Sequence, residues 1–380
     1  MRLPTTLALA CLALWMAAMP VQAQSLLGER FTDPHDGAFD LSDWLLKRKG
    51  FLPVPIVITE PAVGYGAGMG MLFFRESLGE AAQKAKDSGR LAPPDILGGA
   101  AFATENGTWG GAGGGMVSFD ADHYRWRGGV VRTNVNLDFY GQGGKLGPVG
   151  YTLDGWASTQ HAMARLGESD AWLIGRWNYL DLNNRFDNEA GTGRLGSLER
   201  ASKASGLGLS LEYDSRDNIF TPNRGWTGAI DLTFYDPDWG SDTRFQSYRS
   251  HVFSYWQLRK DLVLGGRADL RLANGKAPFF MLPSVDMRGV PAMRLQDTRT
   301  GVLEAELRWN VTPRWAVLGF AGGGRAWNSS SGFGDGTETF SRGVGFRYQL
   351  ARLLGLWVGL DVAKSTQDHA FYIQVGNAWR

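Results

Sequence analysis

Nearly every regular stretch of this chain has one apolar face and one face that carries charges of both signs. Residues 301–311 show this most clearly. The apolar set there is Gly301, Leu303, Ala305, Leu307, Trp309 and Val311, and the alternate set is Val302, Glu304, Glu306, Arg308 and Asn310. A period of two over this length predicts a β-strand.

The same alternation recurs in 207–214, 226–234, 262–272 and 356–362. Burying the charged faces in a dry core would cost several kcal/mol for each unpaired group, whereas a hydrated lumen avoids that cost. Aromatic residues, 12% of the chain, gather near the predicted strand ends, as in the interfacial girdles of membrane barrels. We therefore predict an all-β fold, a transmembrane antiparallel β-barrel. A soluble sandwich or propeller is the alternative.

Counting from residue 51 gives about 16 strands, and short connections alternate with longer ones. Short turns at the periplasmic side and long loops outside are typical of such barrels. The long connections are 188–204, 275–299 and 328–340. One exception is 76–95, which predicts a short helix on the periplasmic side.

The first 23 residues read as a signal peptide, with Arg2 followed by an apolar run and small residues before Gln24. Cys11, the only cysteine, lies inside it; a lipoprotein cleaved at Cys11 is the alternative. We therefore predict that the protein is exported and located in the outer membrane of a Gram-negative cell. A net charge of +1 argues against a nucleic-acid partner.

Residues 24–50 form a short N-terminal segment, and 51–380 are assigned to the barrel. The segment predicts one amphipathic helix, capped by Asp40 or Ser42 and ended by Gly50. Its apolar stripe is Leu41, Trp44 and Leu45.

The sequence DMRGVPAMRLQD at 286–297 interrupts the alternation. Pro291 cannot donate to a central ladder, and loops of this length usually carry function or are disordered.

Three motifs, in this order, resemble the BamA/TamA-type outer-membrane assembly superfamily, also called bacterial surface antigen barrels. The first is LEYDSRDNIFTPNRG at 211–225, a strand and tight turn. Its matching residues are Tyr213, Asp214, Arg216, Asp217, Pro222 and Gly225. The second is Arg288-Gly289, similar to the tip of that family's long sixth outer loop. The third is AELRW at 305–309.

The resemblance implies that the long loop folds into the lumen and that its arginine contacts acidic wall residues. We expect Arg288 to contact Glu306, with Glu304 as a second candidate. The predicted latch consists of Arg288, Gly289, Arg294, Glu304, Glu306 and Arg308. Ordinary solvated loop charges are the alternative.

The chain departs from the family pattern in three ways. Val290 stands where an aromatic residue is usual, and Gly322 where an aspartate is usual, so we expect Glu306 to carry more of the acidic contact. The stretch before the barrel is too short for a POTRA domain.

In this superfamily the first and last strands meet in a weak seam that can open sideways. We assign Gly64, Gly66, Gly68, Gly376 and Trp379 to the seam, with Trp379 facing outward on the last strand. The alternate glycines of 59–74 do not meet the spacing of a phosphate-binding loop.

The resemblance implies assistance with the insertion or translocation of proteins or lipids at the outer membrane. A passive channel or a structural surface antigen is the alternative. The five histidines form no i, i+4 metal pair and no nucleophile elbow is present, so we predict no enzyme, no metal and no cofactor. The expected partners are outer-membrane lipids or lipopolysaccharide, and a periplasmic or lipoprotein partner for substrate delivery.

Overall fold

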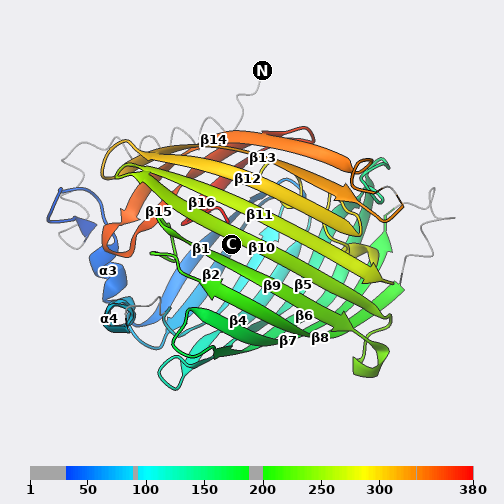
Figure 1. Ribbon diagram of the computed structural model, residues 1–380, viewed down its shortest axis with the longest axis horizontal. Helices are drawn as coiled ribbons and strands as arrows, with labels where there is room; N and C mark the ends of the chain where they lie inside the picture. Colours follow the sequence, from blue (N-terminus) through cyan, green and yellow to red (C-terminus); the bar gives the residue numbers. More distant parts are fainter. Residues whose placement is uncertain (1–30, 89–92, 188–199, 331, 380) are drawn as a thin grey trace.

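Sixteen antiparallel strands form the fold (Figure 1) in a computed structural model that describes residues 31–88, 93–187, 200–330 and 332–379. The first eight are β1 (Gly50–Glu60), β2 (Gly64–Phe74), β3 (Ile96–Thr104), β4 (Trp109–Phe119), β5 (Tyr124–Phe139), β6 (Val149–Arg165), β7 (Ala171–Phe186) and β8 (Arg200–Asp214). The others are β9 (Gly225–Tyr235), β10 (Phe245–Arg259), β11 (Leu262–Gly275), β12 (Arg299–Asn310), β13 (Trp315–Trp327), β14 (Thr337–Ala351), β15 (Leu356–Ser365) and β16 (His369–Val375). The predicted strand number is confirmed.

Each strand pairs with its neighbour in sequence, so one sheet runs from β1 to β16 and curls into a barrel. β1 and β16 come into contact at the end of the circuit. No ladder of hydrogen bonds joins these two fully described strands. The barrel therefore has a seam, defined here as the line between β1 and β16.

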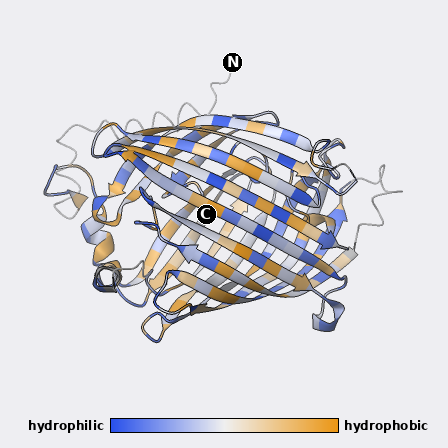
Figure 2. Ribbon diagram, in the orientation of Figure 1, coloured by the Kyte–Doolittle hydropathy of each residue, from blue (hydrophilic) through white to orange (hydrophobic). Residues whose placement is uncertain are grey.

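Hydrophilic and hydrophobic residues alternate along many strands (Figure 2). The exposure of the side chains places most of the strand charges inside and the large apolar side chains outside. On β12, Leu303 is 67% exposed, whereas Glu304 is 6% and Arg308 7% exposed. Because successive side chains of a strand point to opposite faces, one register fixes this for the whole strand. The predicted orientation of 301–311 is confirmed, and the outer wall is apolar.

The two ends of the barrel differ. One end, here called the N-segment mouth, bears α3 (Ser42–Leu46), α4 (Leu78–Ser88) and most of the short turns, to the left in Figure 1. The opposite end, the loop mouth, bears the longer connections. α4 confirms the helix predicted within 76–95. The predicted signal peptide, and most of the predicted loop 188–204, lie outside the described residues.

The N-terminal helix is shorter than predicted, with five residues. The predicted cap is wrong: Leu41 occupies the N-cap without a side-chain bond, although Asp40 accepts a hydrogen bond from the Ser42 amide at 2.6 Å. The predicted end is also wrong, because the helix stops at Leu46 and Gly50, with φ +80°, opens β1. Leu45 packs in a cluster with Leu52 and Phe74. The segment is thereby fixed to the barrel wall.

An ionic cluster, here called the N-terminal clasp, also fixes this segment. Arg314, in the β12–β13 turn, pairs with Asp33, Asp36 and Asp40, and Arg352 also binds Asp33. Hydrogen bonds from Arg352 to Asp33 and from Arg314 to Asp36 hold the pKa values of both carboxyls below their ordinary 3.8. Burial by itself would raise the pKa of Asp40. Hydrogen bonds from Ser42 and Arg314 outweigh that effect, so the pKa of Asp40 also lies below its ordinary value.

Among the helices of the described residues, none has the length and apolar character needed to cross a membrane.

Candidate functional site: the latch loop and the seam

Residues 276–298, between β11 and β12, form a loop that packs against the inner wall and is here called the latch loop. Its short 3-10 helix η6 (Phe279–Met281) places Phe279 against Phe139, Tyr151 and Phe186. Further along, the loop contributes Val285, Met287, Val290 and Leu295 to a buried cluster that also holds wall residues Val302 and Ala326. Val290, which stands where an aromatic residue was expected, is 4% exposed within that cluster.

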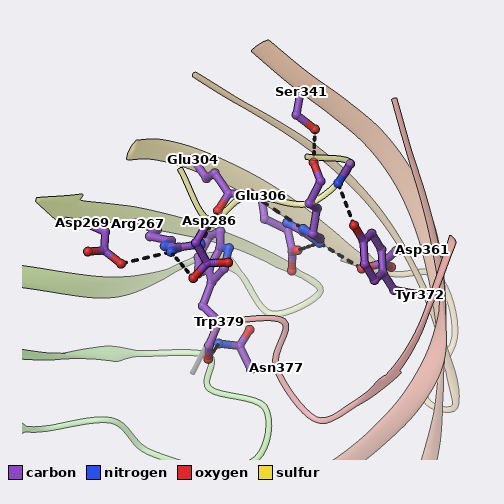
Figure 3. A network of polar contacts seen from close by, with 12 residues as sticks. Arg267, Asp269, Asp286, Glu304, Glu306, Ser341, Asp361, Tyr372, Asn377 and Trp379 are labelled. Atoms are coloured by element: carbon purple, nitrogen blue, oxygen red, sulfur yellow. Dashed lines mark hydrogen bonds and ion pairs between the residues drawn. The ribbon is translucent and has the colours of Figure 1, made fainter. Parts of the chain in front are cut away.

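Arg288 forms ion pairs with three acidic wall residues, Glu304, Glu306 and Asp361, which are labelled in Figure 3. Its guanidinium lies 2.8 Å from Glu306 and donates a hydrogen bond to Asp361 at 2.9 Å. Glu304 is more distant, at 3.8 Å. The ring of Phe320 lies 3.5 Å from the guanidinium carbon, a cation–π distance. The expected pairing with Glu306 is therefore present, together with a carboxylate from β15.

Asp361 supplies a further carboxylate to Arg288, whereas Gly322 has no side chain to do so. The side chain of Asp361 is 0% exposed, and it also accepts hydrogen bonds from Arg347 on β14. Gly322 instead leaves room for its neighbour, because a Cβ there would lie 2.5 Å from the side chain of Glu304. The expectation that Glu306 would carry more of the acidic contact holds only in part, since Asp361 shares it.

Around Arg288 the charges balance. The connected ion pairs join five arginines to five carboxylates. The arginines are Arg249, Arg267, Arg271, Arg288 and Arg347, and the acids are Asp269, Asp286, Glu304, Glu306 and Asp361. A buried charge is tolerated when it is paired, so the network fixes where the loop tip can sit.

Gly289 allows the loop tip to approach the wall. Its φ is +84°, and its amide donates to the Tyr372 hydroxyl on β16 at 2.9 Å. Ser365 donates to its carbonyl at 2.6 Å, and Ser341 donates to that of Arg288. A Cβ at Gly289 would lie 3.2 Å from Ala363 in an already left-handed backbone. The Arg-Gly pair thus combines a charge anchor with a close backbone approach.

The latch loop contacts both sides of the seam. On one side Gly289 binds Tyr372 of β16, and on the other the Ala292 amide donates to the Glu60 carboxylate of β1 at 3.0 Å. Outside the barrel, the rings of Tyr65 on β2 and Phe371 on β16 lie 5.7 Å apart and span the seam. Side chains and loop contacts therefore join β1 to β16 where backbone pairing does not.

The assignment of Trp379 to the outer face is wrong. β16 ends at Val375, and Gly376, with φ +76°, turns the chain so that its amide bonds to the Trp357 carbonyl. Trp379 is 4% exposed and packs against Phe253 and Tyr255 inside the barrel. The indole occupies space beside Gly265, where a Cβ would lie 2.9 Å from its ring. Burial of this large apolar ring outweighs two further residues of strand pairing.

The glycines assigned to the seam also lie elsewhere. Gly64, Gly66 and Gly68 lie on β2, and β1 forms the edge. A Cβ at Gly66 or Gly68 would meet β3 backbone at 2.4 Å, so these glycines permit close approach of β2 and β3. Gly376 acts at the turn after β16, not within its ladder.

Two of the predicted latch arginines lie outside the acidic network. Arg294 donates to the Gly144 carbonyl at 3.2 Å and stacks 4.0 Å over Tyr140. Arg308 is 7% exposed and binds the Pro222 carbonyl at 3.2 Å and the Asn223 side chain.

The turn motif therefore packs into the N-segment mouth. Asp214 holds Arg216 through two hydrogen bonds, and Asp217 accepts from the amides of Asn223 and Arg224. Gly225 has φ +92°, and Tyr213 stacks on Trp226 with centroids 4.6 Å apart. The carbonyl of buried Pro222 accepts a hydrogen bond from Arg308, so the turn is anchored to β12.

Sequence reasoning missed several residues of the site. Tyr372, Ser341 and Ser365 hold the loop backbone, and Glu60 holds it at β1. Asp361 carried a usable signal, because it stood on the charged face of 356–362. The hydroxyl groups carried none, since serine and tyrosine are common on any wetted strand face.

Solved structures with a similar fold were compared with the chain. BamA from Haemophilus ducreyi lacking POTRA domains 1–3 superposes with a TM-score of 0.59 at 12% identity, covering 87% of this chain and 70% of that one. CdiB from Escherichia coli gives 0.57 at 10% identity, and CdiB from Acinetobacter baumannii 0.52 at 11%, each covering 86% of this chain.

This chain has the barrel fold of BamA and CdiB. The predicted fold is confirmed. The chain spans 62% and 59% of the length of the two CdiB chains. No protein-family model matches the sequence, and no curated protein sequence matches it.

Proposed function

We propose that this protein lies in the outer membrane and helps proteins or lipids enter or cross it through the β1–β16 seam, with the latch loop holding the seam closed from inside. The seam carries the proposal: two strand edges meet without a ladder and are bridged by one loop. Unpaired strand edges are templates for pairing with another strand.

The outer wall supports the membrane location. Leu303, Val344 and Val362 are 67%, 65% and 59% exposed, and they belong to a band of large apolar side chains that encircles the barrel. Soluble monomers rarely expose apolar patches of such extent. A bilayer removes this surface from water, while the charged lumen remains hydrated.

The unequal edges support an opening seam. β1 has 11 residues and β16 has seven, so β16 cannot cover the full β1 edge. The residues after β16 turn inward and do not lengthen it. Opening would break side-chain and loop contacts but no continuous ladder, which makes this the weakest line in the wall. A periplasmic or lipoprotein partner for delivery is part of the same proposal.

A reversible cross-link tests the proposal. Cysteines replacing Tyr65 and Phe371, joined by a short cleavable bis-thiol reagent, lock the seam from outside. We expect the locked protein to lose its ability to speed the folding of a urea-unfolded barrel protein into vesicles, and to regain it on cleavage. The control pair replaces Leu307 and Gly319, which are directly opposite on the paired β12 and β13.

The control link should leave the activity unchanged, since it joins strands that stay paired. Equal activity of seam-locked and unlocked protein would sink the proposal and favour a passive channel. A protein that shows no activity in either state while conducting ions would favour the same alternative.

A further inference from the structure

Two cations stand directly opposite each other on the outer face near the loop mouth. Arg342 of β14 pairs in register with Lys364 of β15, and both are exposed. They share the outward face with Val344 and Val362. Lys364 is one residue from the end of β15, so this pair lies near the rim of the apolar wall.

Neither cation has a hydrogen bond or an ion pair with any residue that the structure describes. The neighbouring carboxylates have other partners: Asp368 accepts a hydrogen bond from the backbone amide of His369 at 2.7 Å, and Glu338 pairs with Arg325. His369 faces Lys364 across the ladder. Like charges directly opposite on one face destabilise a sheet. An anion between Arg342 and Lys364 would reverse the sign of that interaction.

A hollow of about 640 Å³ lies in the outer wall over β10–β14, and its lining includes Phe340, two residues before Arg342. Small residues form its floor, among them Ala268, Gly301 and Gly323. Leu303 and Phe340 form its apolar sides, at 67% and 58% exposure. An alkyl chain lying in the hollow would therefore contact the floor and both sides, whereas a chain on a flat barrel wall contacts one surface only.

A third cation stands above the hollow. Arg299 opens β12 two residues before Gly301, on the same outward face. It forms no ion pair with any described residue. An apolar hollow below a rim of unpaired cations matches an amphiphile with anionic groups at the surface and alkyl chains in the bilayer.

We propose that β12–β15 bind a phosphate-bearing lipid of the outer leaflet, with Arg342 and Lys364 on its phosphate and its acyl chains along the hollow. The phosphate offers several acceptor oxygens, so one group can bridge both cations. Arg342 and Lys364 lie on the two strands just before β16, which places the phosphate group near the seam. This inference rests on the proposed membrane location.

Native mass spectrometry of the full chain in non-ionic detergent tests the site. The probe is a bis-phosphorylated glycolipid, with its dephosphorylated form and inorganic phosphate as separate arms. The test variant is Arg342→Ser with Lys364→Ser, and the control is Lys47→Ser with Arg48→Ser, which removes two positive charges at the opposite mouth. We expect the test variant to bind the phosphorylated lipid at least about tenfold more weakly and the control to bind it normally.

Three outcomes would overturn the lipid site. They are equal binding by the test variant and the native chain, equal binding of the dephosphorylated lipid, and retention of inorganic phosphate as strongly as of the lipid. Detergent-free solubility of the folded chain would instead defeat the membrane location itself. The two failures are therefore distinguishable.

Discussion

Removing the charge of Arg288 is the most direct test of the latch. Arg288→Met keeps the length and much of the apolar contact with Phe320 but leaves five carboxylates facing four arginines. Asp361 keeps Arg347 and Glu304 keeps Arg267, whereas Glu306 loses its only arginine ion pair among the described residues.

Breaking a buried ion pair costs about 3–5 kcal/mol, and the remaining arginines and the wet lumen reduce this. We expect a loss of about 2–4 kcal/mol in the free energy of unfolding. The matched variant is Arg294→Met in the same loop. That arginine has a hydrogen bond to a backbone carbonyl and a ring contact with Tyr140, so its loss should cost about 1 kcal/mol.

Urea unfolding in detergent micelles, followed by tryptophan fluorescence and by the mobility of the folded barrel in electrophoresis, gives both values. Adding Glu306→Gln to Arg288→Met restores the charge balance and should recover at least half of the loss. If Arg288→Met is as stable as Arg294→Met, or if Glu306→Gln gives no recovery, the charge network does not hold the loop.

Two further predictions concern the N-terminal clasp and the tip of the latch loop. A nitroxide label on His35→Cys should be immobile at pH 5 and above and become mobile as the pH falls below about 3.8. The reason is that the lowered pKa values of Asp33, Asp36 and Asp40 add stability above the ordinary carboxyl pKa, and this stability is lost as the pH falls through the folded-state pKa values. Arg314→Met should make the label mobile at pH 7, and a label whose mobility changes in neither experiment would contradict the clasp. Gly289→Val should displace the loop and lower the free energy of unfolding in urea by about 2–3 kcal/mol, because a β-branched residue is strained at φ +84° and its Cβ would press on Ala363. The control is Gly334→Val, where the space around the glycine is open. Equal stability of the two variants would refute the tight fit.

The strand face of the charged residues in 301–311 was predictable. Glu304, Glu306 and Arg308 were placed inward from a period of two alone, and they are inward. The sequence could not assign their partners, because a strand face fixes direction but not distance around the barrel. Glu306 meets Arg288, whereas Arg308 reaches a turn 85 residues away in the chain.

At the end of the chain, the strand face itself was predicted wrongly. Phe371, Ile373 and Val375 follow the alternation, and extending it by four residues beyond Val375 placed Trp379 outside. A glycine at φ +76° ends the strand, and the buried space beside Phe253 decides where the indole goes. Local periodicity carries no information about space on the far wall.

The sequence by itself determined the sixteen-stranded barrel, the sidedness of its wall and the arginine at the loop tip, because each follows from the period of a strand or the chemistry of one residue. Only the tertiary structure decided that Asp361 supplies a further carboxylate to Arg288, that the loop bridges β1 and β16, and that Asp33, Asp36 and Asp40 close on Arg314. These contacts join residues from 73 to more than 270 positions apart. Closure of the sheet into a barrel is what brings them within bonding distance.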